Sequence, residues 1–123
     1  MMKTAYPITP FINVQVWVKK KSDGTGYEVR SEPVVPMVVQ KDTVINYQIV
    51  DTFGEDIVFS GLAVTPEDLN QISVPAISAS GKLLTVSDAN TQCCRLNLNL
   101  EFIDKSQSIR FMHDPQIQND TEI

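Results

Sequence analysis

The chain has 123 residues, of which 42% are hydrophobic and 20% are charged, a composition typical of one globular domain. Its formal net charge of −5 argues against nucleic acid as a partner, because binding to phosphates needs a positive field. The sequence contains no apolar run long enough to span a membrane, and Met1–Phe11 carries Pro7 and Pro10 where a signal peptide needs an uninterrupted apolar stretch.

Alternation of apolar and polar residues is the strongest structural signal. Successive side chains of a strand point to opposite faces, so such a pattern predicts a strand with one buried face and one face in water. The pattern is clearest after Cys93, where every second residue from Cys94 to Phe102 is apolar. The predicted strands, in chain order, are Phe11–Lys19, Tyr27–Ser31, Val34–Val39, Thr43–Val50, Ile57–Val64, Lys82–Ser87, Cys93–Phe102 and Ser108–His113.

Two of these strands carry a hint of their place in a sheet. Val34–Val39 contains Pro36 and follows Pro33, and proline cannot donate to the hydrogen-bond ladder of a sheet. We therefore expect an edge strand, or a strand that crosses between sheets. Ile57–Val64 is apolar on both faces, as a central strand would be.

The other segments are expected to be less regular. Thr65-Pro66-Glu67-Asp68 has the residue types of a helix start, with Thr65 as the cap and Pro66 at the first position, and predicts a turn or two of helix. Ser73–Ser80 contains a proline and is expected to form an irregular strand or a loop. Asp114-Pro115 ends the regular structure, and the polar tail from Gln116 is expected to fray.

Seven to eight short strands with at most one short helical turn predict an all-β fold. We expect a single domain over residues 1–123, folded as a two-sheet antiparallel sandwich with immunoglobulin-like layering. A small barrel is the alternative.

Residues that usually perform catalysis or hold metal ions are scarce. His113 is the only histidine, and the side chain of the adjacent Asp114 would diverge from it along a strand, so no catalytic triad is expected. Zinc sites use four nitrogen or sulfur ligands, whereas Cys93 and Cys94 would face opposite sides. We expect no metal and no cofactor. The adjacent cysteines are interpreted as free thiols, which favours a reducing compartment and a cytoplasmic location.

Trp17 is a candidate binding residue. Alternation places it on the polar face of its strand, and an exposed Trp often anchors an interface. The equal alternative is a Trp covered by sheet twist or by a loop. Val34–Val39 is a second candidate, since an apolar edge is either protected by its prolines or used to pair with another chain.

Two short motifs give the chain a resemblance to a known family. Glu32-Pro33 lies near the end of the second predicted strand, and Asp114-Pro115 lies just after the last one. With these dipeptides at these places and with this length, the chain resembles the DP-EP family of small bacterial proteins, which has no assigned activity. The resemblance implies a bacterial β-sandwich of one domain and supplies no mechanism.

The two motifs also suggest a place for function. If they lie at the same end of the sandwich, Glu32, His113 and Asp114 could form one acidic patch, although strand termination explains both dipeptides as well. We expect a non-catalytic protein-binding or assembly module that binds a protein partner or itself. The alternative is an enzyme or a metal-dependent activity at this patch, which requires the three side chains to converge.

Overall fold

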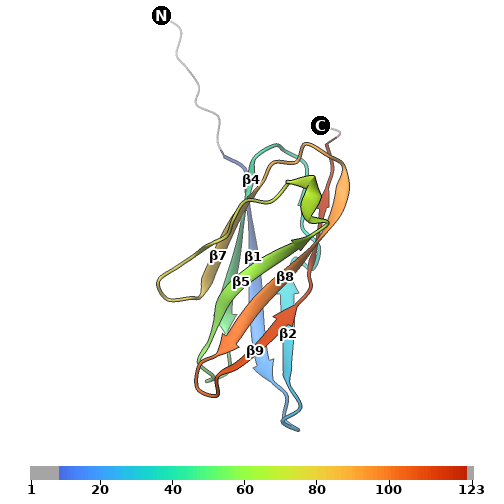
Figure 1. Ribbon diagram of the computed structural model, residues 1–123. Helices are drawn as coiled ribbons and strands as arrows, with labels where there is room; N and C mark the ends of the chain where they lie inside the picture. The colour runs from blue at the N-terminus through green and yellow to red at the C-terminus, as the bar shows by residue number, and fades with distance from the viewer. Residues whose placement is uncertain (1–8, 122–123) are drawn as a thin grey trace, which may run out of the picture.

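The computed structural model describes residues 9–121 and shows two layers of strands packed face to face (Figure 1). The strands are β1 (Phe11–Lys20), β2 (Tyr27–Glu32), β3 (Met37–Val38), β4 (Thr43–Asp51), β5 (Ile57–Thr65), β6 (Ala76–Ile77), β7 (Leu83–Asp88), β8 (Cys94–Asp104), β9 (Ile109–His113) and β10 (Gln116–Asn119). One 3-10 turn, η1 (Glu67–Leu69), lies between β5 and β6.

The strands form two sheets. Sheet A has the order β2-β1-β4-β7-β6, and sheet B has the order β3-β10-β8-β5, with β9 also paired to β8. The predicted all-β sandwich is confirmed. The strands are not all antiparallel, however, because β1 pairs with β4 and β3 pairs with β10 in parallel. The reason lies in the path of the chain, which leaves sheet A after β2, forms β3 in sheet B, and returns beside β1 as β4. The immunoglobulin-like layering stays a prediction.

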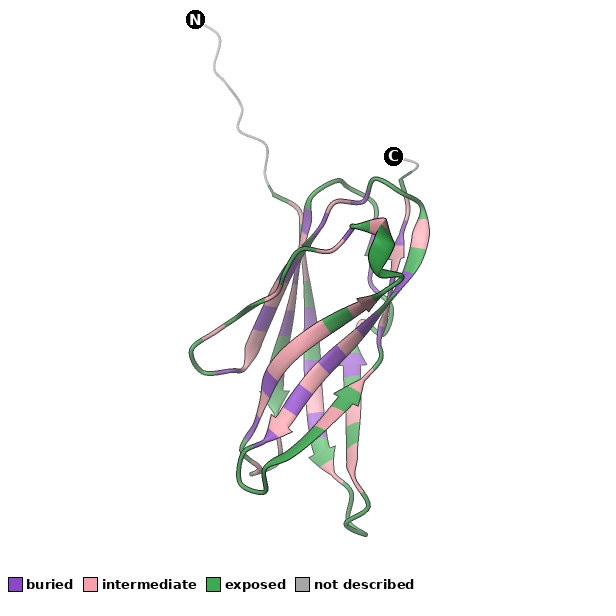
Figure 2. Cartoon of the chain, in the orientation of Figure 1, coloured by how far each residue is buried: buried purple, intermediate pink, exposed green. Residues whose placement is uncertain are grey.

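The core lies between the sheets and is built from the inward positions of the alternating strands. Figure 2 shows buried positions alternating with less buried ones along the strands. Full burial of one aliphatic or aromatic side chain contributes about 1.5–3 kcal/mol, so these side chains hold the layers together. The buried apolar residues are Val14, Val16, Val18, Val38, Ile45, Tyr47, Ile49, Ile57, Phe59, Leu84, Val86, Leu96, Leu98, Leu100, Phe102 and Ile117.

The expectation that Ile57–Val64 forms a central strand is wrong, because β5 is an edge of sheet B. The chain just before β7 covers this edge. The Phe59 N–H donates to the Gly81 carbonyl at 2.8 Å, and Lys82 Nζ donates to the Ile57 carbonyl. The backbone of this edge is therefore partly hydrogen-bonded to a loop instead of to a neighbouring strand.

The expected frayed tail is also wrong for Gln116–Asn119, which forms β10 between β3 and β8. Only one of its four residues is apolar, so hydrophobic alternation does not reveal it.

Thr65 and Pro66 do not begin an α-helix. Thr65 ends β5, and η1 has no side-chain hydrogen bond at its cap. Within Val34–Val39, only Met37 and Val38 pair as a strand, and this strand is the edge of sheet B.

Candidate functional site

Trp17 lies in a hollow on the outer face of sheet A. The hollow has a volume of about 260 Å³ and is lined by Trp17, Lys19, Glu28, Arg30 and Phe53, which we call the Trp17 hollow. Strand register explains the grouping, because Trp17 pairs with Arg30 and Lys19 pairs with Glu28 across β1 and β2. All four of these side chains occupy outward positions, so they share one surface.

Cation–π contacts organise this hollow. The guanidinium carbon of Arg30 lies 4.7 Å from the Trp17 ring centroid, and Lys19 Nζ lies 5.8 Å from the Phe53 ring centroid. Such contacts are favourable because the faces of aromatic rings carry negative potential. Trp17 is half-buried beneath Arg30, whereas Phe53 keeps 54% of its surface exposed. The sequence left two alternatives for Trp17, an exposed ring and a covered ring. In the structure the ring is partly covered by Arg30 and still lines an open surface.

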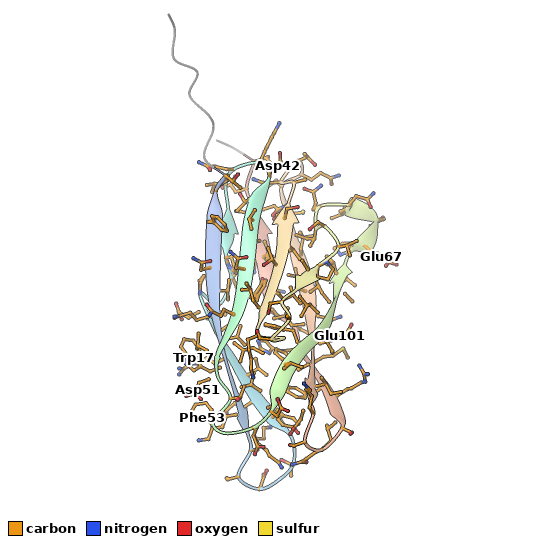
Figure 3. All side chains as sticks on the ribbon, turned by 90° about the vertical axis from the view of Figure 1, so that its left-hand side faces the viewer. Trp17, Asp42, Asp51, Phe53, Glu67 and Glu101 are labelled. Atoms are coloured by element: carbon orange, nitrogen blue, oxygen red, sulfur yellow. The ribbon has the colours of Figure 1, made fainter. Side chains whose placement is uncertain are left out.

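A turn brings Phe53 to Trp17. The register between β1 and β4 shifts after Val16, so that Trp17 pairs with Asp51. Asp51 Oδ1 accepts a hydrogen bond from the Phe53 N–H at 2.8 Å and holds the left-handed turn residue Phe53, whose φ is 53°. Figure 3 shows Trp17, Asp51 and Phe53 close together on one side of the sandwich.

The Trp17 hollow continues into a cationic surface at the β1–β2 hairpin. A second hollow of about 260 Å³ is lined by Lys19, Lys20, Lys21, Ser22, Asp23 and Glu28. The two hollows share Lys19 and Glu28, so four cations and two acids surround this end of sheet A. The lining of these two hollows thus carries more cations than acids, and Asp51 lies beside Trp17.

Farther along the same face, the side chains around a third hollow are uncharged, and three of them are amides. A shallow hollow of about 440 Å³ is lined by Phe11, Asn13, Val44, Asn46, Gln48, Leu83 and Thr85. Asn46 Nδ2 donates to Asn13 Oδ1 at 3.1 Å, and Thr85 Oγ1 donates to Asn46 Oδ1 at 2.7 Å. These bonds join two amides and one hydroxyl in a row across β1, β4 and β7.

Glu32, His113 and Asp114 are not gathered into one site. Glu32 is exposed and pairs with Gln15 in sheet A. His113 and Asp114 line a hollow of about 200 Å³ together with Ser31, Val34, Val35, Pro115 and Gln116. The two dipeptide segments therefore flank the same hollow, but Glu32 is not part of its lining.

The chemistry of this hollow is modest. Burial lowers the pKa of His113, and the charge of Asp114 offsets this only in part. The ring is therefore held toward its neutral form near pH 7. Among residues 9–121, no group of three His, Cys, Asp or Glu side chains is placed to hold a metal ion.

Arg30 and Phe53, the partners of Trp17, were missed by reasoning from the sequence. Their contacts depend on strand register and on a bulge, for which the linear pattern carries no signal. Cys93 and Cys94 are free, as predicted. No helix within the described part of the chain is long and apolar enough to cross a membrane.

Comparisons with known proteins add a family but no mechanism. Comparison with curated protein sequences finds no match. Among solved structures, the chain is similar to Lac15 from a marine microbial metagenome, with a TM-score of 0.46 and 10% sequence identity. The alignment covers 97% of this chain and 36% of that one, so the chain spans little more than a third of Lac15.

The family comparison agrees with the two dipeptide motifs. The model of the DP-EP family matches residues 10–121, which is nearly the whole chain and includes Glu32-Pro33 and Asp114-Pro115. The protein belongs to the DP-EP family.

Proposed function

We propose that the protein is a non-catalytic binding module that takes a protein partner at the Trp17 hollow. The observation that carries this proposal is the grouping of Trp17, Arg30 and Phe53 around one hollow on an open sheet face. Trp and Arg are the residue types most enriched among binding hot spots, and aromatic residues are common at interface centres. The contact with Arg30 also holds the Trp17 ring in place before binding, which lowers the entropy that association costs.

The charges around the hollow favour an acidic partner segment. Lys19, Lys20, Lys21 and Arg30 outnumber the acids Asp23 and Glu28 in the lining of the two hollows. Complementary charge raises the association rate and selects against basic partners. The exposed Phe53 ring offers apolar contact to the same segment.

We place this module in the cytoplasm of a bacterial cell. Two adjacent free cysteines support a reducing compartment, since exposed thiols are readily oxidised elsewhere. An enzyme or a metal-dependent activity at Glu32, His113 and Asp114 has less support, because Glu32 does not line the hollow of the other two.

The test is a capture experiment followed by a direct affinity measurement. Wild type, Trp17→Ala, Arg30→Ala and Met112→Ala serve as baits in a bacterial lysate, and the captured proteins are identified by mass spectrometry. Met112 is 65% exposed and lies on β9 of the other sheet, so its variant controls for the loss of any exposed large side chain.

The affinity of a captured partner should fall by roughly 30-fold or more with Trp17→Ala, as expected for a hot spot worth about 2 kcal/mol. It should fall less with Arg30→Ala, stay unchanged with Met112→Ala, and weaken as the salt concentration rises. A partner that binds wild type and Trp17→Ala equally well, with both baits folded by circular dichroism, would refute the proposed surface.

A further inference from the structure

Two aspartates are fully buried, and their surroundings differ. Asp104 has both oxygens in hydrogen bonds: Oδ2 accepts from the Tyr27 hydroxyl at 2.6 Å, and Oδ1 accepts from the Ser106 hydroxyl at 2.7 Å. Asp88 is satisfied on one side only. Its Oδ1 accepts from the Asn90 N–H and from Asn119 Nδ2, both at 3.0 Å, whereas Oδ2 has no partner.

The two asparagines beside Asp88 are buried as well, and each has an unpartnered oxygen. Asn119 Nδ2 donates to Asp88 Oδ1 and to Gln71 Oε1, and Asn119 Oδ1 has no partner. Asn90 Nδ2 lies within hydrogen-bond distance of three backbone carbonyls, and Asn90 Oδ1 has no partner. Because both Nδ2 groups face only acceptors, turning either amide over would replace favourable contacts with repulsive ones.

The cluster therefore holds three bare oxygens, Asp88 Oδ2, Asn90 Oδ1 and Asn119 Oδ1, and all of them are acceptors. Each buried acceptor without a partner is unfavourable by roughly 1–3 kcal/mol. The residues come from two segments: Asp88 and Asn90 lie at the end of β7 and in the turn that follows it, and Asn119 lies at the end of β10. The Tyr47 hydroxyl, which is also buried without a partner and interacts electrostatically with Asp88, adds one bare donor to these three bare acceptors. The excess of acceptors suits a ligand that is itself positive or a donor.

The buried carboxylate of Asp88 favours a positively charged ligand over a neutral one. Within residues 9–121, no Lys, Arg or His forms an ion pair with Asp88. Burial raises the pKa of Asp88, and the hydrogen bonds from Asn119 and Asn90 offset this only in part. A water molecule would donate to the bare oxygens but leave the carboxylate charge uncompensated, whereas a cation does both. One carboxylate matches one positive charge.

A surface hollow adjoins the cluster at Asn90. This residue lines a hollow of about 260 Å³ together with Val39, Gln40, Lys41 and Thr121. The cluster therefore lies at the end of the sandwich, next to a hollow that contacts one of its residues.

We propose that Asp88, Asn90 and Asn119 bind a small monovalent cation of the sodium class through these three bare oxygens. Hard alkali and alkaline-earth cations take oxygen ligands, and this set contains no imidazole or thiolate that would favour a transition metal. The site is separate from the Trp17 hollow, which lies on the outer face of sheet A, so the two proposals stand or fall independently.

The experiment measures the unfolding temperature at pH 8 in sodium chloride and in choline chloride at equal ionic strength, because choline is too large for the cluster. Wild type should unfold at a temperature higher by a few degrees in sodium, and the difference should saturate with concentration, as it does for a ligand that binds the folded state. Asp88→Asn should show no difference, because it removes the charge and provides an N–H for the bare oxygens.

Asp104→Asn is the matched control. It also neutralises a fully buried aspartate, but one whose oxygens already have partners, so its sodium response should equal that of wild type. Equal unfolding temperatures of wild type in the two salts would overturn the proposal, and this comparison needs no variant. A sodium response that persists in Asp88→Asn would overturn it too.

Discussion

Tyr27→Phe removes one oxygen atom that joins an edge strand of sheet A to a central strand of sheet B. The Tyr27 hydroxyl on β2 donates to Asp104 Oδ2 on β8 at 2.6 Å, while its ring stacks on Phe111 with the centroids 3.9 Å apart. Phenylalanine keeps the stacking and loses only the hydrogen bond. A hydrogen bond to a charged group contributes about 1.5–3 kcal/mol.

We expect the lower end of that range, about 1.5 kcal/mol. Asp104 keeps its bonds from Ser106, and it lies next to the exposed turn 105–108, from which water can reach a freed oxygen. Urea denaturation at pH 7 measures the free energy of unfolding. A loss below about 0.5 kcal/mol with an unchanged m value would refute the assigned strength of this bond.

Tyr47→Phe is the natural control, because the Tyr47 hydroxyl is buried without a partner. The same substitution there removes an unsatisfied polar atom and should leave the free energy of unfolding unchanged or slightly higher.

The pH dependence gives a second readout of the Tyr27 bond. Burial alone would raise the pKa of Asp104, but the hydrogen bonds from Tyr27 and Ser106 outweigh it and hold this pKa below its ordinary value. A lowered pKa stabilises the fold above the unfolded-state value of about 3.9, and this stability is lost as the pH falls through the folded-state pKa. Tyr27→Phe raises that pKa, so acid destabilisation should begin at a higher pH than in wild type.

Two further predictions concern glycine and cysteine. Gly81 has a φ of 76°, and a Cβ there would lie 2.6 Å from Val58 Cβ, so Gly81→Ala should destabilise the fold by more than about 2 kcal/mol. Gly24 has the same φ with nothing within 4 Å, so Gly24→Ala should cost only about 1 kcal/mol; equal losses in urea denaturation would contradict the steric explanation. Cys93 is exposed, whereas burial raises the pKa of Cys94, so iodoacetamide should modify Cys93 first and Cys94 faster at higher pH, as followed by mass spectrometry.

Hydrophobic alternation was sufficient to find most strands of this fold. The predicted Phe11–Lys19 and Thr43–Val50 differ from β1 and β4 by one residue at one end, because their inward positions are consistently apolar. The same signal misses β10, whose inward positions are Ile117 and the buried Asn119. Asparagine at an inward position is rare unless other residues satisfy it, and those residues are distant in sequence.

The sequence also does not predict which strands are neighbours or which residues contact Trp17, because both depend on residues that are distant in the chain. Nothing local distinguishes the edge strand β5 from a central strand, because the loop at Gly81 supplies the cover that a strand would otherwise provide. Trp17 was singled out by its parity, but Arg30 and Phe53 reach it through register and a bulge. Parity does place Asp88 inward with Leu84 and Val86.

The position of β10 has a consequence for the order in which the protein folds. Met37 of β3 pairs with Gln118 of β10, and within its sheet β3 has no other neighbour. During synthesis, β3 therefore waits for almost the whole chain before it acquires a partner strand, although its Val38 is fully buried in the folded protein. Contacts this distant in sequence slow folding to the millisecond-to-second range typical of β-sandwiches. Truncation before Gln116 should therefore yield an aggregation-prone chain with an unpaired edge.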